Sequence, residues 1–293
     1  MNSIGVQRSF AEDATLSDRL FELLDTVFPE LSIIQMAQLI KTLGTSWESV
    51  STPFMCFEGE RAIAHVGVLE IPVWMMGKPM IIGGIHGVAT HPDYRRRGYY
   101  RQCITAALDY CATRYQTLAL TTDQPDYYTP FGFRAIQEHA FVAECQSTGD
   151  HNGFRILDLK IDTDRAILHR LLDERTSVSD SLGSIGAKAL FFFNEVNNPL
   201  YYAEDLDLII AMEIENTQLK LHDIVWKQPC QLIDILDRIP QPIHKAVFYF
   251  SPDRLNIDAQ AVPQLQGGDS YLMVHGEFAA EGRSFMLPRS ARC

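Results

Sequence analysis

Two long apolar segments, followed by a basic turn, a helix and a third strand, constrain the fold of this chain most strongly. Ala62 to Met76 and Pro79 to Thr90 flank the turn residues Gly77-Lys78, which predicts an antiparallel hairpin. Arg101 to Arg114 has apolar residues at helical spacing, and Thr117 to Thr122 is typical of a short buried strand. The order strand, strand, helix, strand predicts a mixed α/β fold.

The turn before that helix has the chemistry of an anion-binding site. Gly87 to Arg101 reads G-V-A-T-H-P-D-Y-R-R-R-G-Y-Y-R, and Pro92 interrupts the strand before three arginines. Such a turn points consecutive backbone N–H groups outward at a helix N-terminus, where the helix dipole also favours negative charge. Gly98 permits a positive φ or a close approach of backbone to ligand. A diphosphate fits this arrangement, and a solvated basic turn is the alternative interpretation.

A second landmark follows one helix and one strand later. Tyr128 to Phe133 reads Y-T-P-F-G-F, which places a tyrosine four residues before Gly-Phe. Together with the R-R-R-G sequence of Arg95 to Gly98, it resembles the GNAT superfamily of N-acetyltransferases, whose pattern R/Q-x-x-G-x-G/A opens a helix. The chain departs from this pattern at Tyr100, where the superfamily has a small residue. The resemblance covers roughly residues 4 to 145.

This resemblance implies an α+β (mixed α/β) GNAT fold, a central mostly antiparallel sheet flanked by helices, with acetyl-CoA as co-substrate. The pantetheine arm of acetyl-CoA would pair with the strand before the turn, and the backbone amides of the turn would hold the pyrophosphate. The implied cofactor-binding residues are Val88, Ala89, Thr90, Arg95, Arg96, Arg97, Gly98, Tyr99, Tyr100, Arg101, Thr122 and Asp123.

Tyr128 is the candidate general acid. When an amine attacks the thioester, the departing CoA thiolate needs a proton or a hydrogen bond, and a phenol with a pKa of about 10 can supply it. Tyr127 is a rival, but the register relative to Gly132 favours Tyr128. A tyrosine that only packs in the core is the alternative interpretation.

The general base is less constrained by the sequence. GNAT enzymes often carry a carboxylate on the strand before the turn, but the matching position here is close to Gly84. His86 lies two residues on and points to the same face, so it could accept a proton directly or through water. A structural histidine is equally compatible, and His65, Glu70 and Asp123 remain candidates.

The second half of the chain repeats the element order of the first. A polar, turn-rich segment at residues 146–153 predicts a boundary between a GNAT acetyltransferase domain over 1–147 and a second lobe over 152–293. In the second lobe, the junction between the predicted strand Gln218 to Trp226 and the predicted helix Gln231 to Ile239 lacks glycine and an arginine cluster. Pro229 also removes one backbone amide from this junction. We therefore expect a degenerate GNAT-like lobe that binds no cofactor and closes the acceptor site. The repeated elements are Leu206 to Glu215, Gln218 to Trp226, Gln231 to Ile239 and His244 to Phe250.

This organisation resembles the bacterial enhanced-intracellular-survival (Eis-like) group, without the sterol-carrier-like domain of that group. In the group, a C-terminal carboxylate reaches the active site and serves as base. The apolar segment Phe285 to Pro288 could dock residues 289–293 similarly, and a frayed end is the alternative. The aromatic run Phe191 to Phe193, with Gly183 and Gly186, could line an acceptor pocket or form a core helix.

Composition limits the partners and the compartment. With 25 Lys and Arg against 37 Asp and Glu, the formal charge is −12, which argues against a nucleic-acid surface. Six scattered cysteines, with no C-x-x-C pair and no His cluster, indicate reduced thiols of a cytoplasmic protein and no metal site. We expect no membrane association, because no apolar run approaches ~20 residues. Homo-oligomerisation stays open.

The sequence thus predicts an acetyl-CoA-dependent N-acetyltransferase. Its acceptor would be a primary amine, whether a small amine, a polyamine, an aminoglycoside or a lysine side chain, that attacks directly in a ternary complex. A non-catalytic acyl-CoA sensor is the alternative.

Overall fold

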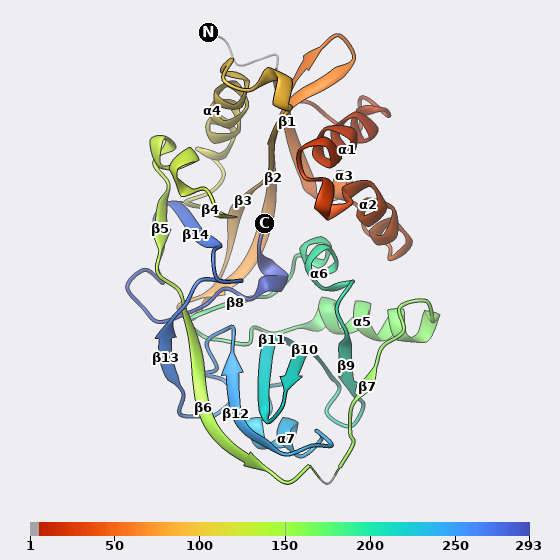
Figure 1. Cartoon of the computed structure of the whole chain (residues 1–293), viewed down its shortest axis with the longest axis vertical. Helices are drawn as coiled ribbons and strands as arrows, with labels where there is room; N and C mark the ends of the chain where they lie inside the picture. The colour runs from red at the N-terminus through yellow and green to blue at the C-terminus, as the bar shows by residue number, and fades with distance from the viewer. Residues whose placement is uncertain (1–5, 150) are drawn as a thin grey trace.

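The computed structural model describes residues 6–149 and 151–293 and contains two lobes, each built on a seven-stranded mixed sheet (Figure 1). The predicted first strand, at residues 4–10, lies partly outside the described residues. Within them, Gln7 pairs with Phe54 beside the edge of the first sheet. The α+β architecture with two lobes, predicted from the sequence, is confirmed.

The first sheet has the order β1-β2-β3-β4-β14-β5, with β8 pairing with the far end of β2. The hairpin predicted from its Gly77-Lys78 turn is confirmed as β2 and β3, and the strand Thr117–Thr122 as β4. The strands are β1 (Ser51–Glu58), β2 (Arg61–Met75), β3 (Lys78–Thr90), β4 (Thr117–Thr122), β5 (Arg134–Ile136), β8 (Leu182–Ser184) and β14 (Tyr271–Gly276).

The second sheet has the order β13-β6-β12-β11-β10-β9-β7. Here β10 and β11 pair antiparallel while β11 and β12 pair parallel, as β2, β3 and β4 do in the first lobe. Its strands are β6 (His139–Ser147), β7 (Arg155–Ile156), β9 (Leu200–Ala203), β10 (Leu208–Glu215), β11 (Gln218–Trp226), β12 (Ile243–Phe248) and β13 (Gln260–Pro263).

The two halves of the chain exchange strands. β14, from the end of the chain, lies between β4 and β5 of the first sheet, and β6 lies between β12 and β13 of the second. The single strand expected over Phe133 to Cys145 is therefore two, because the chain leaves the first sheet after Ile136. Glu138, at the break, is fully buried and forms an ion pair with Arg292. The predicted division at 147–152 thus separates segments of sequence, while each sheet draws strands from both segments.

Helices cover both faces of the first sheet. α4 buries Cys103, Ile104 and Ala107 against one face, and α1 buries Leu16, Leu20 and Leu24 against the other. The second lobe packs α5 and α7 against its sheet. The helices are α1 (Leu16–Val27), α2 (Ile33–Thr42), α3 (Trp47–Val50), α4 (Tyr99–Cys111), α5 (Asp162–Glu174), α6 (Lys188–Glu195) and α7 (Leu232–Leu236).

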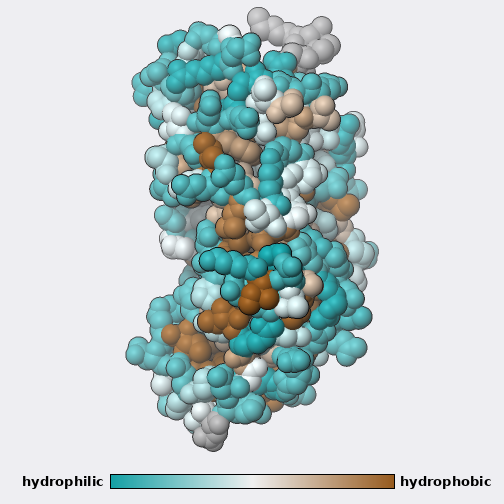
Figure 2. All heavy atoms as spheres, turned by 90° about the vertical axis from the view of Figure 1, so that its right-hand side faces the viewer, coloured by the Kyte–Doolittle hydropathy of each residue, from teal (hydrophilic) through white to brown (hydrophobic). Residues whose placement is uncertain are grey.

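The face that carries α2, α5 and β7 combines a mostly hydrophilic surface with apolar atoms near the meeting of the lobes (Figure 2). Exposed apolar side chains on these elements include Leu39, Ile156 and Ile161. Among the described residues, no single helix is long and apolar enough to cross a membrane. A bent pair of helices, Leu16–Val27 with Pro29–Thr42, meets that test only by combined length and composition.

Candidate functional site

The candidate site lies where β3 and β4 separate. These parallel strands pair only at Gly83 with Leu118 and at Gly84 with Ala119. Beyond those pairs, Ala89 and Thr90 of β3 pair with β2 on one side only, and Val88 lies at an irregularity in that pairing. The edge of β3 that faces β4 is therefore open to an extended ligand over the segment predicted to pair with pantetheine.

The basic turn has the predicted anion-binding geometry. Arg96 has a φ of 63° and Gly98 a φ of 86°, so left-handed residues alternate just before α4. The first amide bonded at this end of the helix is that of Gln102, which donates to the Gly98 carbonyl (3.1 Å). The amides of residues 96–101 have no backbone acceptor among the described residues. Free amides in this geometry form a concave anion site.

The arginine side chains of this turn can also contact a bound phosphate group. Arg95, Arg96, Arg97 and Arg101 are exposed, and none forms an ion pair with a described residue. Arg97 lies over the Tyr94 ring at 5.1 Å, and Arg101 over the Phe131 ring at 5.3 Å. These contacts hold positive charge at the start of α4, where phosphate oxygens would meet it.

Replacement of Gly98 with valine tests this turn. Because Gly98 has a positive φ that β-branched residues avoid, and its missing Cβ would face open space, the substitution changes backbone geometry without a clash. We expect the KM for acetyl-CoA to rise at least tenfold, or about 1.4 kcal/mol. Gly59→Val is the matched control, since Gly59 has a φ of 58° and open space in the remote turn between β1 and β2. Equal KM values in the two folded variants would contradict the assignment.

Tyr128 lies in a short segment of two 3-10 turns, Pro125–Tyr127 and Thr129–Phe131, that follows β4. Its side chain is 8% exposed, whereas that of Tyr127 is 63% exposed. Burial, followed by electrostatic interactions with Cys293 and Asp123, raises the pKa of Tyr128 to about 12, although a hydrogen bond with Thr122 opposes the shift. The phenol therefore keeps its proton at neutral pH and can act as a donor.

His86 approaches the open strand edge from the other face of the sheet. Tyr128 packs in the cluster under α4, whereas His86 contacts Trp47, a member of the cluster under α1, at a ring distance of 4.6 Å. His86 Nε2 lies 2.9 Å from Ser51 Oγ. Burial, and to a lesser degree His65, lowers the pKa of His86 to about 3, so it is a weak base at neutral pH.

His65 is the second buried histidine of this region. Its side chain has no exposed surface, and its Nδ1 lies 2.6 Å from the Gly87 carbonyl oxygen, to which it donates. Burial lowers the pKa of His65 to about 4, against the opposing effect of this hydrogen bond. Both histidines are therefore neutral in the folded protein near pH 7.

The two histidines should make the protein sensitive to acid. Both have pKa values near 6.5 when unfolded and lower values when folded, so the unfolded state binds more protons below pH 6.5. We expect the free energy of unfolding to fall as pH drops from about 6.5 toward 4, by up to about 1.4 kcal/mol per pH unit for each histidine. In denaturant titrations at several pH values, His86→Asn should weaken the pH dependence of the free energy of unfolding by the contribution of about one bound proton. Replacement of the exposed His151 should leave it unchanged.

The last residue of this sequence occupies the point where β3 and β4 separate, as the position of the C-terminus in Figure 1 shows. The Cys293 carbonyl oxygen accepts bonds from Thr121 N (2.8 Å) and Thr121 Oγ1 (2.6 Å). A Cβ at Gly84 would lie 2.8 Å from Cys293 Sγ. The position where GNAT enzymes often carry a carboxylate is therefore a glycine whose side-chain space Cys293 fills.

Ionic contacts with both lobes fix this tail. Arg289 pairs with the buried Glu195 of α6 at 2.8 Å, and Arg292 pairs with Glu138 at 2.6 Å. Ser290 Oγ donates to Asp223 on β11. The sequence suggested a docked tail from its apolar residues, but the acidic partners were missed because they lie far away along the chain.

The aromatic run on α6 divides between two roles. Phe191 and Phe192 are 1% exposed and belong to the core between the lobes. Phe193 is half-buried and packs edge-on against Trp47 at 5.0 Å, so it joins the second lobe to the His86 side of the site.

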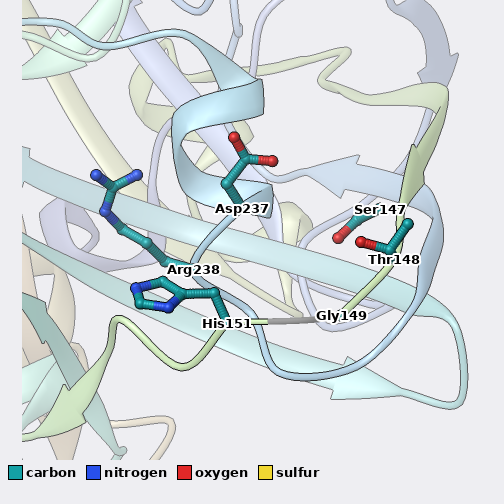
Figure 3. Close-up of a pocket in the computed structure, with 6 residues that line it drawn as sticks. All are labelled: Ser147, Thr148, Gly149, His151, Asp237 and Arg238. Atoms are coloured by element: carbon teal, nitrogen blue, oxygen red, sulfur yellow. The ribbon is translucent and has the colours of Figure 1, made fainter.

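A cavity of about 390 Å³ lies elsewhere, beside α7 at the far end of the second lobe (Figure 3). It is lined by Ser147, Thr148, Gly149, His151, Asp237 and Arg238, and none of the predicted site residues contributes to it. Within the described residues, no group of three or more His, Cys, Asp or Glu side chains is placed to hold a metal ion.

The comparisons with known proteins concern the domain and the fold. Residues 15–136, from the start of α1 to the end of β5, match the family model described as an acetyltransferase (GNAT) domain. No curated protein matches the chain in sequence.

Solved structures share the fold over most of the chain. A probable N-acyltransferase from Enterococcus faecalis V583 has a TM-score of 0.60 at 12% identity, covering 92% of this chain and 71% of its own. A GCN5-related N-acetyltransferase from Kribbella flavida has a TM-score of 0.51 at 16% identity, covering 94% and 72%. Eis1 from Mycobacterium abscessus has a TM-score of 0.49 at 13% identity, covering 91% and 71%.

The likeness to the first two structures shows the fold of both lobes, and the family model matches the first lobe to an acetyltransferase (GNAT) domain. The chain therefore carries a GNAT acetyltransferase domain over residues 15–136, which supports an acetyltransferase activity.

Proposed function

We propose that the protein transfers the acetyl group of acetyl-CoA to a primary amine in a ternary complex. The observation that carries the proposal is the turn at residues 95–101 beside an open edge of β3. Among the described residues, its amides from Arg96 to Arg101 have no backbone acceptor and its arginines form no ion pair. The pyrophosphate would bind this turn, and the pantetheine arm would pair with Val88 to Thr90. Thr122 and Asp123, at the end of β4, would border the thioester end of the ligand.

Tyr128 and His86 lie on opposite faces of the first sheet, which suits a reaction that needs a proton donor for the leaving thiolate and a base for the attacking amine. The amine nitrogen attacks the thioester carbon, the C–S bond breaks, and CoA leaves as a thiolate. Tyr128 would donate its phenolic proton to that thiolate, while a base on the other side takes one proton from the attacking amine. Reprotonation of Tyr128 from solvent then restores the enzyme.

Two groups compete as the base. His86 stands on the Trp47 side, but its pKa of about 3 limits it to relaying a proton through water. In a protein whose chain ends at Cys293, a carboxylate would stand beside Thr121 and act as the stronger base, as in the Eis-like group. Removal of residues 290–293 from a folded protein separates the two. Retained CoA binding without turnover supports the tail. Full activity returns the role to His86 or to the other candidates, which are His65, Glu70 and Asp123.

The second lobe is proposed to close the acceptor site without binding CoA. Its junction between β11 and α7 contains Pro229 and no arginine cluster. Phe193 and Asn194 of α6 reach the site, since Phe193 packs on Trp47 and Asn194 Nδ2 donates to the Arg292 carbonyl (3.0 Å). Six free thiols support a cytoplasmic location for this enzyme.

Release of free thiol from acetyl-CoA in the presence of single amines tests this function. Small amines, polyamines, aminoglycosides and lysine peptides form the panel, and at least one class should give thiol release that depends on the amine. Binding of CoA without release for any class would instead favour the acyl-CoA sensor. A protein that fails to bind CoA would contradict both, since a ligand at 100 times Kd should add about 2.7 kcal/mol of stability.

A further inference from the structure

Tyr100 occupies the position where the GNAT pattern has a small residue, and its side chain joins two parts of the candidate site. It lies in the first turn of α4 and is half-buried. Its Oη donates a hydrogen bond to the Tyr127 carbonyl oxygen at 2.9 Å. Its ring packs edge-to-face against Tyr128 at 6.3 Å and against Phe131 at 5.5 Å. One side chain thus connects the helix that begins at the phosphate turn with the segment that carries Tyr128.

The segment around Tyr128 also contacts the first lobe through the Tyr128 side chain, which forms a hydrogen bond with Thr122, and through Arg101, which lies over the Phe131 ring. Its hydrogen bonds are mostly internal, such as Tyr128 N to Pro125 O (3.0 Å) and Thr129 Oγ1 to Pro125 O (3.1 Å). The side chain of Tyr127 is exposed, so the Tyr127 backbone rather than its ring is held in place. Among the described residues, Tyr100 Oη makes the hydrogen bond between α4 and this segment.

We propose that Tyr100 is a positioning residue for Tyr128, fixing the phenol at the leaving thiolate. This inference rests on the proposed acetyl transfer. It predicts that the hydroxyl of Tyr100 acts on the chemical step and not on the affinity for CoA, because the hydroxyl points at a protein carbonyl. A small residue at this position would leave the Tyr128 segment without this hydrogen bond to α4.

Tyr100→Phe removes the hydroxyl and keeps the ring contacts. We expect kcat to fall about tenfold, the size of one hydrogen bond, while the KM for acetyl-CoA stays within about twofold. In a Tyr128→Phe background the same change should have no further effect on kcat, because the two residues act as a unit. Tyr110→Phe is the matched control, since Tyr110 lies in the same helix, outside the predicted binding residues, and its ring contacts Phe54 and Arg114 instead.

Amide hydrogen exchange of residues 125–132 provides a readout that does not depend on turnover. Tyr100→Phe should speed exchange in this segment at least about fivefold, and Tyr110→Phe should not. The proposal is overturned by unchanged exchange, by a loss confined to KM, or by a loss of kcat that multiplies with that of Tyr128→Phe. If no amine is acetylated, the proposed function fails, and the exchange result still decides whether Tyr100 holds the Tyr128 segment.

Discussion

Replacement of Tyr128 with phenylalanine is expected to lower kcat by about 10²- to 10⁴-fold and to leave the affinity for acetyl-CoA nearly unchanged. The thiolate that needs the proton exists only late in the reaction, so a donor that serves it contributes to the transition state and not to ground-state binding. The pKa of Tyr128, raised to about 12 by burial, keeps the phenol protonated across the working pH range. Steady-state thiol release at saturating acetyl-CoA, with a separate measurement of the CoA dissociation constant, tests this expectation.

Tyr127→Phe is the control for Tyr128. The two tyrosines are neighbours in sequence, but Tyr127 points into solvent while Tyr128 is buried beside Thr122 and Phe133. The Tyr127 substitution should leave kcat within about twofold, because surface changes remote from the chemistry are nearly neutral. Equal losses in both variants, or none in Tyr128→Phe, would move the proton donor to another group.

Substitution of Asp223 with alanine should have the largest effect on stability. Asp223 and Arg175 form an ion pair at 2.9 Å with neither side chain exposed, and Ser290 of the tail donates to the same carboxylate. Loss of Asp223 leaves the Arg175 guanidinium buried without its countercharge, which costs about 3–5 kcal/mol. Chemical denaturation should report this loss, and kcat should also fall because the tail loses its contact with β11.

An exposed ion pair serves as the control that separates the effect of burial on stability from the effect of charge. Arg238 and Asp205 form an ion pair in which the aspartate is 63% exposed, so Asp205→Ala should cost at most about 1 kcal/mol. If Asp223→Ala does not fold, the double variant Arg175→Met, Asp223→Leu should restore folding, because apolar pairs can replace buried ion pairs of similar volume. Similar small costs at both aspartates would show that Asp223 is not a structural anchor.

The parts of the fold and site that were predicted from the sequence are those determined by residues close together along the chain. The hairpin of β2 and β3, the strand β4 and the turn at residues 95–98 each depend on neighbouring residues, and periodicity and turn chemistry predict them. Helix ends were less certain, since α4 runs from Tyr99 to Cys111 and not from Arg101 to Arg114.

The parts that were missed depend on contacts between distant segments. Nothing in the sequence near Glu138 predicts a buried carboxylate, because its partner Arg292 lies at the other end of the chain. The pairing of β14 with β4 and β5 likewise brings together residues that no local pattern relates. His86 was placed correctly on the face of Gly84, but its weak basicity follows from burial by Trp47 and Ser51, which only the packing shows.

The exchange of strands between the lobes also affects how the protein can fold during synthesis. The ribosome releases β4 and β5 long before β14, so the first sheet lacks an inner strand until Gly276 has emerged. Until then β4 presents a free edge, which is an opportunity for pairing with the wrong strand. The second sheet already holds β6, which is made early. Completion of the acetyltransferase lobe is therefore a late step, and fragments cut between the lobes should each bind the other to regain their missing strands.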